Sequence, residues 1–403
     1  MKSSFLSYLA LGLILLLAVY IVGDLFQSPD MRQWDFKSYY CAAKAAAAGA
    51  NPYDGTEVLH YAGGLRGLLP YVYPPPTLAF FRPFTWLPFP AACEVWLVLK
   101  LLLLVGLILV WRGRIFPMEP AVPFYLLLLL AFGSAIYVDL DSGNVTLLEQ
   151  FLLWLGIASL LRGRPRPLVF CASLLLAAFF KLTPLAFVLL LPALGVRRCW
   201  RYVGLSVAVF IGLAAVSYLA DPLGWQHFFT NVMAIDEPGI HSNPSLLSLM
   251  KDVVQSIAAK WGGRAPDFIP GGLYLVSAAL ILGVSVWCWR SIRFRRGVDR
   301  DMVILCLFCV TFALIMPRFK TYAFVLLLPP AYYAISRNAR MPAFAFMLVL
   351  LVLRGDASLP VNPFLKLFWQ YYPLLLAFMV WGLLLRLARA TAGDGGPVPS
   401  AGA

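Results

Sequence analysis

The chain has 403 residues, of which 61% are hydrophobic and 13% charged, and its mean hydropathy is +0.81. Soluble domains carry about 25% charged residues, so the composition excludes a water-soluble protein and favours a polytopic membrane protein. The net charge of +13 does not require a nucleic-acid partner, because an excess of Lys and Arg in cytoplasmic loops produces the same balance.

Hydrophobic runs of spanning length predict an all-α protein of about twelve transmembrane helices. No small-residue cleavage site follows the first run, so it is interpreted as an uncleaved span rather than a signal peptide. The predicted spans are residues 5–23, 88–111, 121–138, 145–161, 168–180, 184–196, 202–220, 272–290, 302–316, 322–335, 341–353 and 372–388.

Charge in the loops predicts the topology. Lys and Arg concentrate in the loops that begin at Arg112, Arg162, Val196, Arg290 and Ser336, which are therefore assigned to the cytoplasmic side. Neighbouring short spans could each form one bent element or a re-entrant hairpin. Merging a pair into one span would invert all later loops, so the pairs are predicted as hairpins with outward tips.

This topology leaves three sizeable outer loops, at residues 24–87, 221–271 and 354–371. The predicted organisation is one integral membrane catalytic domain over residues 1–388 and a disordered cytoplasmic tail over residues 389–403. No inner loop is long enough to fold and no Gly-rich phosphate loop is present. Any chemistry is therefore expected on the outer face of the cytoplasmic (inner) membrane.

The first outer loop opens with "QWDFKSYYCAAKAAAAGANPYD" from Gln33. Residues 34–48 are predicted to form an interfacial helix that ends at Gly49. Asp35 falls in the first turn, where the helix dipole favours a carboxylate, and Tyr39 follows on the same face. A simple helix start with interfacial aromatic residues is the alternative interpretation.

Downstream in the same loop, "GLLPYVYPPPTLAFFRPFTWLPFP" from Gly67 contains Tyr73 followed by three prolines. Proline restricts the backbone and removes hydrogen-bond donors, so the segment is predicted to be a rigid extended strand. A scaffold and a binding role are both open for Tyr73.

In the second outer loop, "IHSNPSLLSLMKDVVQSIAAKWGG" predicts an amphipathic interfacial helix, with Asn243 as its N-cap and Pro244 as its first residue. His241 and Asn243 precede this N-terminus, which is a suitable place for an anion. A solvent-exposed loop histidine is the alternative for His241.

Four cations lie where apolar runs end on the predicted outer side: Lys181, Arg318, Lys320 and Arg354. Snorkelling to lipid headgroups explains such positions in part. Positive charge on the outer side nevertheless opposes the usual bias, and ionisable residues at membrane depth indicate function. The four are predicted to bind a membrane-embedded phosphate.

Asp139 and Asp141 form a D-x-D pattern in "YVDLDSGNVTLL". The pattern resembles a metal–nucleotide site, but a turn before the fourth span is the preferred interpretation. The seven cysteines lie mostly in apolar runs and show neither metal-site nor disulfide spacing, so they are predicted to be apolar fillers.

These segments together resemble glycosyltransferase family 87, within the polyprenol-phosphate-dependent class with the C-type membrane fold. The resemblance rests on "WDFKSYYCAAKAAAAGANPYD" and "YVYPPPTLAFFRPFTWLP", with further agreement in "SGNVTLL", "KLTP" and "NPSLLSL". Asn144 and Pro244 stand where the family pattern has Gln, which leaves the sugar and the acceptor open.

The resemblance implies transfer of a mannosyl- or arabinofuranosyl-type sugar from a polyprenyl phosphate to a hydroxyl of a glycan or glycolipid. Asp35 matches the acid in the first outer loop that acts as general base. The cations would hold the leaving phosphate, so no metal and no cofactor is expected. Tyr39, Tyr73, His241 and Asn243 are candidate donor or acceptor contacts.

Two other classes of function are open. A transporter or flippase of lipid-linked sugars would also combine many spans with basic residues, but the absence of evident internal repeats disfavours it. A lipid-sugar ligase or polymerase would also act outside and would place its chemistry in a later loop.

Overall fold

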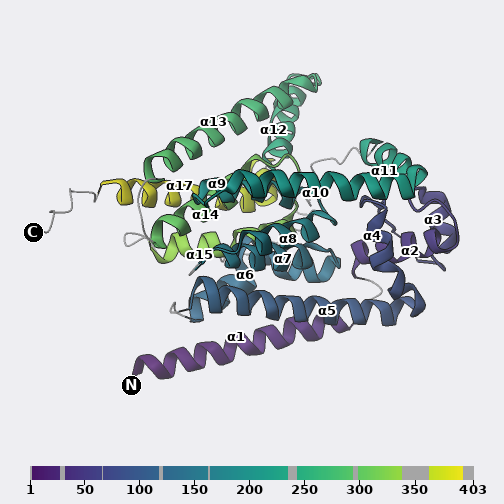
Figure 1. Ribbon diagram of the computed structural model, residues 1–403, viewed down its shortest axis with the longest axis horizontal. Coiled ribbons are helices and arrows are strands. Elements are labelled where there is room, and N and C mark those ends of the chain that lie inside the picture. Colours follow the sequence, from purple (N-terminus) through teal and green to yellow (C-terminus); the bar gives the residue numbers. More distant parts are fainter. Residues whose placement is uncertain are drawn as a thin grey trace, which may run out of the picture. The chain divides into compact units, whose positions relative to one another are not determined.

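The computed structural model describes residues 2–27, 32–65, 67–117, 121–161, 164–234, 243–293, 298–337 and 363–393. Within these ranges the chain is helical and contains no strand (Figure 1), which confirms the predicted all-α class. The predicted span at 341–353, the outer loop at 354–371 up to residue 362, and most of the predicted tail lie outside the described residues.

The chain forms two compact units. The first consists of Met1–Val122, Ile136–Pro192 and Val196–Glu237, and the second of Pro123–Ala135, Ala193–Gly195 and Pro238–Ala403.

The first unit contains the elements that carry the candidate site. They are α1 (Lys2–Phe26), α2 (Trp34–Ala47), α3 (Gly55–Tyr61), α4 (Pro76–Phe81), η1 (Arg82–Trp86), α5 (Phe89–Val110), η2 (Trp111–Ile115), the end of α6 (Ala121–Ser142), α7 (Thr146–Leu160), α8 (Pro167–Ala178), η3 (Thr183–Leu189), α9 (Leu190–Ala193), α10 (Cys199–Ala220) and α11 (Pro222–Ala234).

The second unit contains the start of α6 and the later helices. These are α12 (Leu246–Lys260), α13 (Phe268–Ile292), α14 (Val298–Ile315), η4 (Thr321–Leu327), α15 (Leu328–Ser336) and α17 (Pro363–Gly393).

Helix α6 passes from one unit to the other through a break in its backbone. Phe132, Gly133 and Ser134 have φ values of 52°, 74° and 60°, in the left-handed region. Residue 133 must be glycine for a second reason, because a Cβ atom there would overlap the hydroxyl of Tyr372. The break separates an N-terminal apolar half from the C-terminal half that carries Asp139 and Asp141.

Six described helices are long and apolar enough to cross a membrane. They are Ser7–Phe26, Phe89–Ile115, Ala121–Ser142, Cys199–Ala220, Phe268–Ile292 and Leu367–Arg389. Four shorter apolar helices fall at other predicted spans. One of them, α8, has 12 residues and so reaches only about 18 Å, against about 30 Å for the hydrocarbon core. The count of twelve complete spans is not confirmed.

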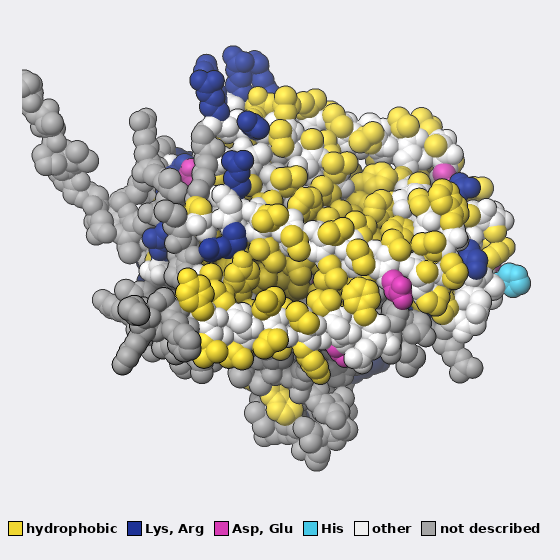
Figure 2. All heavy atoms as spheres, turned by 90° about the horizontal axis from the view of Figure 1, so that it is seen from below, with side chains coloured by type: hydrophobic (Ala, Val, Ile, Leu, Met, Phe, Trp, Pro, Cys, Tyr) yellow, Lys and Arg dark blue, Asp and Glu magenta, His cyan; other side chains and the backbone are white. Residues whose placement is uncertain are grey.

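Much of the surface is apolar, as the bilayer requires. The helices α1, α10 and α13 expose leucine, valine and aromatic side chains along their length. On the face drawn in Figure 2, hydrophobic side chains cover most of the described surface. The protein is therefore a multi-pass membrane protein, as its composition predicts.

Local predictions near the outer loops are partly correct. Gly49 follows α2 with a left-handed φ of 81°, as predicted for the residue after a helix. The predicted extended segment is extended only as far as Pro74, because α4 and η1 make residues 76–86 helical. Proline at a first helical position explains this, since its fixed φ suits a helix start. The N-cap of α12 is Ser245 rather than Asn243, because the Ser245 hydroxyl accepts from the Ser248 N–H.

Candidate functional site

Asp35 lies in the first turn of α2, as predicted, and is 8% exposed. Gln33, the N-cap residue of α2, has a left-handed φ of 52°. Its backbone N–H donates to the Asp141 carbonyl at 2.7 Å and its side-chain amide to the Cys93 carbonyl at 3.1 Å. The start of α2 is thereby fixed to α5 and to the end of α6.

A tight turn after α6 approaches the same helix start. Gly143 has a φ of 70°, and a Cβ atom there would lie 2.8 Å from the Phe36 Cβ and 2.9 Å from the Gln33 Cβ. The Trp96 indole N–H donates to the Gly143 carbonyl at 2.8 Å, and its ring stacks on Phe36 at 5.3 Å. Glycine is required here because the turn must contact α2 closely.

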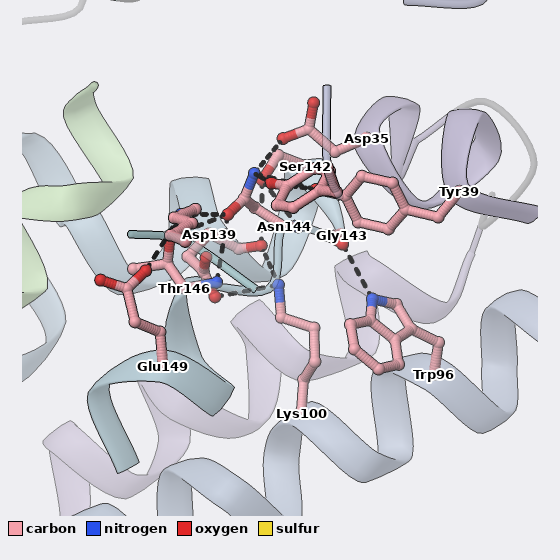
Figure 3. Close-up of polar contacts among 12 residues, drawn as sticks. Asp35, Tyr39, Trp96, Lys100, Asp139, Ser142, Gly143, Asn144, Thr146 and Glu149 are labelled. Atoms are coloured by element: carbon pink, nitrogen blue, oxygen red, sulfur yellow. Dashed lines mark hydrogen bonds and ion pairs between the residues drawn. The ribbon is translucent and has the colours of Figure 1, made fainter. Parts of the chain in front are cut away.

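The turn places Asn144 at the centre of a buried polar network (Figure 3). The Asn144 Nδ2 group donates to Asp35 Oδ2 at 2.7 Å, and it lies 3.1 Å from the Tyr39 hydroxyl and 3.3 Å from the Tyr73 hydroxyl. The other carboxylate oxygen of Asp35 points away from Asn144 in Figure 3. Asp35 and Tyr39, predicted on one helix face, and Tyr73, predicted in a different segment, are thus brought together by one amide.

Lys181 reaches the opposite side of that amide. Its Nζ donates to Asn144 Oδ1 at 3.1 Å and to Thr146 Oγ1 at 2.9 Å, and it lies 3.1 Å from Glu149 Oε2. Lys181 occupies the turn between α8 and η3, which pack on each other. Burial lowers the pKa of Lys181, but the charge of Glu149, its hydrogen bond with Lys181 and the charges of Tyr73 and Asp139 together outweigh burial, so the pKa is raised.

A second ion pair lies beneath the turn. Lys100 of α5 contacts Asp139 Oδ2 at 2.9 Å, and the two side chains are 1% and 0% exposed. The Lys100 ammonium also donates to the Asp139 backbone carbonyl. In Figure 3, Lys100 and Trp96 rise side by side from α5 toward the turn. The pair therefore joins α5 to the last turn of α6, directly before Asn144.

Two tyrosine hydroxyls complete the network around Asp35. Those of Tyr39 and Tyr73 lie 2.8 Å apart, and the two rings meet edge to face at 5.0 Å. Burial raises the pKa of the Tyr73 hydroxyl, so it stays neutral. These two hydroxyls provide hydrogen bonds beside the Asp35 carboxylate.

Asp141 does not form the predicted outer turn. It lies in the last turn of α6, where Arg32 Nη1 is 3.4 Å from its Oδ1 and 2.9 Å from Asp24 Oδ2. In the described part of the chain, no group of three or more His, Cys, Asp or Glu side chains is arranged to hold a metal ion. The D-x-D pattern thus contributes two ion pairs to the scaffold.

The remaining predicted residues lie in the second unit or outside the described ranges. The Asn243 side chain accepts from the Phe319 N–H at 2.8 Å, and the Ser245 hydroxyl donates to the Pro317 carbonyl at 2.7 Å. These bonds attach the segment that carries Arg318 and Lys320 to the N-terminus of α12. His241 and Arg354 are outside the described residues.

Sequence analysis missed Asn144, Thr146, Glu149 and Lys100 as site residues. Sequence offered a signal for Lys100, because a charge in the middle of a predicted span indicates a buried partner. Asn144 was noted only as a departure from the family pattern. The cysteines form no disulfide, and all except Cys199 are buried, in line with apolar packing.

Comparison with known proteins places these residues in context. Residues 71–317 match the model of glycosyltransferase family 87. This range contains Asn144 and Lys181, and it begins after Asp35. Over 303 residues the chain is 26% identical to a Mycobacterium tuberculosis (strain ATCC 25618 / H37Rv) protein named polyprenol-phosphate-mannose-dependent alpha-(1-2)-phosphatidylinositol mannoside mannosyltransferase. The match covers 71% of this chain and 66%, just under two thirds, of the relative. No solved structure matches.

Proposed function

Because the chain belongs to glycosyltransferase family 87, we propose that it is a membrane enzyme that transfers a sugar from a polyprenyl phosphate. The sugar is mannose and the acceptor is a hydroxyl of a glycolipid. The name of the M. tuberculosis relative supports both assignments. The apolar surface supports a donor and an acceptor that reach the enzyme through the bilayer.

The observation that carries the proposal is the contact between Asp35 and Asn144. A carboxylate at the start of a helix, 2.7 Å from an amide donor, is held in one orientation, and the helix dipole favours its negative charge. Asp35 lies outside the matched range, yet its main partner lies inside it. A general base needs both an ionised group and a fixed position.

In the proposed reaction, Asp35 removes the proton of the acceptor hydroxyl as its oxygen attacks C1 of the donor sugar. The bond between C1 and the phosphate oxygen breaks, and the electron pair leaves with the polyprenyl phosphate. A phosphate is a good leaving group, so the site needs cations near it rather than an acid. The balance requires no metal or redox group.

Arg318 and Lys320 are proposed to hold the phosphate, together with Arg354. The first two flank Phe319, whose N–H is fixed by Asn243 at 2.8 Å. Both cations are therefore attached to the N-terminus of α12, whose dipole also favours an anion. Tyr39, Tyr73 and His241 are proposed contacts of the sugar or acceptor, and the site faces the outer side of the cytoplasmic membrane.

Purified protein in lipid vesicles tests the proposal with a polyprenyl-phosphate [³H]mannose donor and a phosphatidylinositol mannoside acceptor. We expect labelled glycolipid and an equal amount of free polyprenyl phosphate. No transfer, together with movement of the intact donor between leaflets, would support the flippase alternative and refute the proposal.

The variant Asp35→Asn tests the base. It keeps the size of the side chain and removes its basicity, so transfer should fall by about 10²–10⁴-fold. Asp54→Asn is the matched control, because Asp54 caps α3 by accepting from the Thr56 N–H at 2.7 Å. Normal transfer by Asp35→Asn would show that Asp35 is not the general base.

A further inference from the structure

The side-chain amide of Asn144 has only one orientation that its neighbours allow. Three donors surround Oδ1: Lys181 Nζ at 3.1 Å, the Thr146 N–H at 3.1 Å and the Thr146 hydroxyl at 2.8 Å. A rotated amide would direct N–H groups at these donors. The Nδ2 group must therefore face the Asp35 carboxylate.

We propose that Asn144 and Lys181 are positioning residues for Asp35: Lys181 fixes the orientation of the Asn144 amide, and the amide fixes the carboxylate. This inference rests on the proposed function, in which Asp35 is the base. It reassigns Lys181, whose sequence position predicted a ligand of the donor phosphate. Lys181 is then not a ligand of the donor phosphate.

The contacts of Lys181 support this reassignment. An ammonium has three N–H bonds, and Asn144, Thr146 and Glu149 supply three acceptors within 3.1 Å. The charge of Glu149 neutralises that of Lys181 inside the protein. A phosphate would have to displace one of these acceptors, at the cost of leaving it buried without a partner.

Other titratable and charged groups surround the Asp35–Asn144 pair, and six chain segments contribute one each. They are Tyr39 on α2, Tyr73 before α4, Lys100 on α5, Asp139 on α6, Glu149 on α7 and Lys181 before η3. Lys100 pairs with Asp139 and Lys181 with Glu149.

The pH profile of transfer by the variant Asn144→Asp tests whether Asn144 acts on Asp35. The substitution would place a second carboxylate at the position of Nδ2, which is 2.7 Å from Asp35 Oδ2. Two carboxylates at that distance share a proton, so the pair's upper pKa rises. We expect the acidic limb of the kcat profile to move upward by more than about one pH unit.

Asn51→Asp is the matched control. It adds the same charge to the same outer loop, and its Oδ1 can still accept from the Tyr53 N–H at 3.0 Å. Its profile should coincide with that of the unmodified protein. An unmoved acidic limb in folded Asn144→Asp, or an equal movement in Asn51→Asp, overturns the inference.

The variant Lys181→Met tests the same inference if Asn144→Asp does not fold. Without Lys181 the Asn144 amide and the Asp35 carboxylate lose their fixed orientation. We expect kcat to fall by about tenfold or more, and the KM for polyprenyl-phosphate mannose to stay within about twofold of that of the unmodified protein. The opposite pattern, a raised donor KM with normal kcat, would make Lys181 a phosphate ligand and overturn the inference. Absence of transfer by the unmodified protein, or normal transfer by Asp35→Asn, would instead refute the proposed function.

Discussion

Gly143 shows how a single residue sets the distance between Asn144 and the start of α2. Its φ of 70° disfavours any side chain, and a Cβ atom would meet Phe36 and Gln33 at 2.8 and 2.9 Å. We expect Gly143→Ala to separate the turn from α2, to lower the melting temperature, and to lower the rate of transfer by at least about tenfold. Thermal unfolding and initial rates on one sample measure the two effects.

Gly49→Ala is the control for that change. Gly49 also has a left-handed φ, of 81°, but a Cβ atom there would meet nothing within 4 Å. It should cost the strain of the backbone, about 1–2 kcal/mol, with little effect on transfer. Equal losses of transfer in the two variants would show that close packing at Gly143 is unimportant.

The buried pair of Lys100 and Asp139 gives a second prediction at this scale. Replacing only Lys100 by Met leaves a carboxylate that is 0% exposed without its cation, which typically costs about 3–5 kcal/mol. The double variant Lys100→Met/Asp139→Asn should recover much of that stability. Chemical unfolding of both variants in detergent measures the difference, and equal stability of the two would contradict the role of the pair.

At the scale of elements, the attachment of the Pro317–Lys320 segment to α12 determines where two cations lie. The Asn243 side chain holds the Phe319 N–H at 2.8 Å and also donates to the Ser248 hydroxyl at 3.0 Å. We expect Asn243→Ala to raise the donor KM by about tenfold and to leave kcat nearly unchanged, because the proposed phosphate ligands lose their position. Arg318→Gln should have the same effect.

A surface variant of the same helix provides the control. Lys260 lies in the last turn of α12 and is exposed, so Lys260→Gln changes the charge of the helix away from the segment. Its donor KM should be normal. A normal donor KM in Asn243→Ala and Arg318→Gln as well would limit both residues to a structural role.

Helices α2 and α12 and the turn at Asn144 show what the sequence could and could not predict. The composition and periodicity of residues 34–48 predicted α2, its end before Gly49 and the place of Asp35, because these depend on local rules; the helix ends one residue earlier than predicted, at Ala47. Asn144 could not be recognised, because its role comes from contacts with α2 and with Lys181 that no spacing reveals. The start of α12 was placed two residues early, since Asn243 resembles a cap but bonds to Phe319 instead.

At the scale of the whole molecule, the prediction of twelve spans depended on charge, whereas the described helices give six of full length. Short helices such as α8, with 12 residues, satisfy the apolar pattern without reaching across about 30 Å of hydrocarbon. Hydrophobicity therefore predicted the positions of the helices better than the number of helices that cross the membrane. The sidedness of the loops, predicted from the positions of Lys and Arg, stays a prediction.

Labelling with a membrane-impermeant maleimide tests that sidedness. His60 on α3 and Arg197 before α10 are exposed and belong to the same unit. Cys199, the one native cysteine that is not buried, is first replaced by Ser. In intact cells we expect His60→Cys to react and Arg197→Cys to react only after permeabilisation, because the Arg-rich loop is predicted inside. The reverse pattern would put the Asp35 loop on the cytoplasmic side, and the proposed transfer on the outer face would then be wrong.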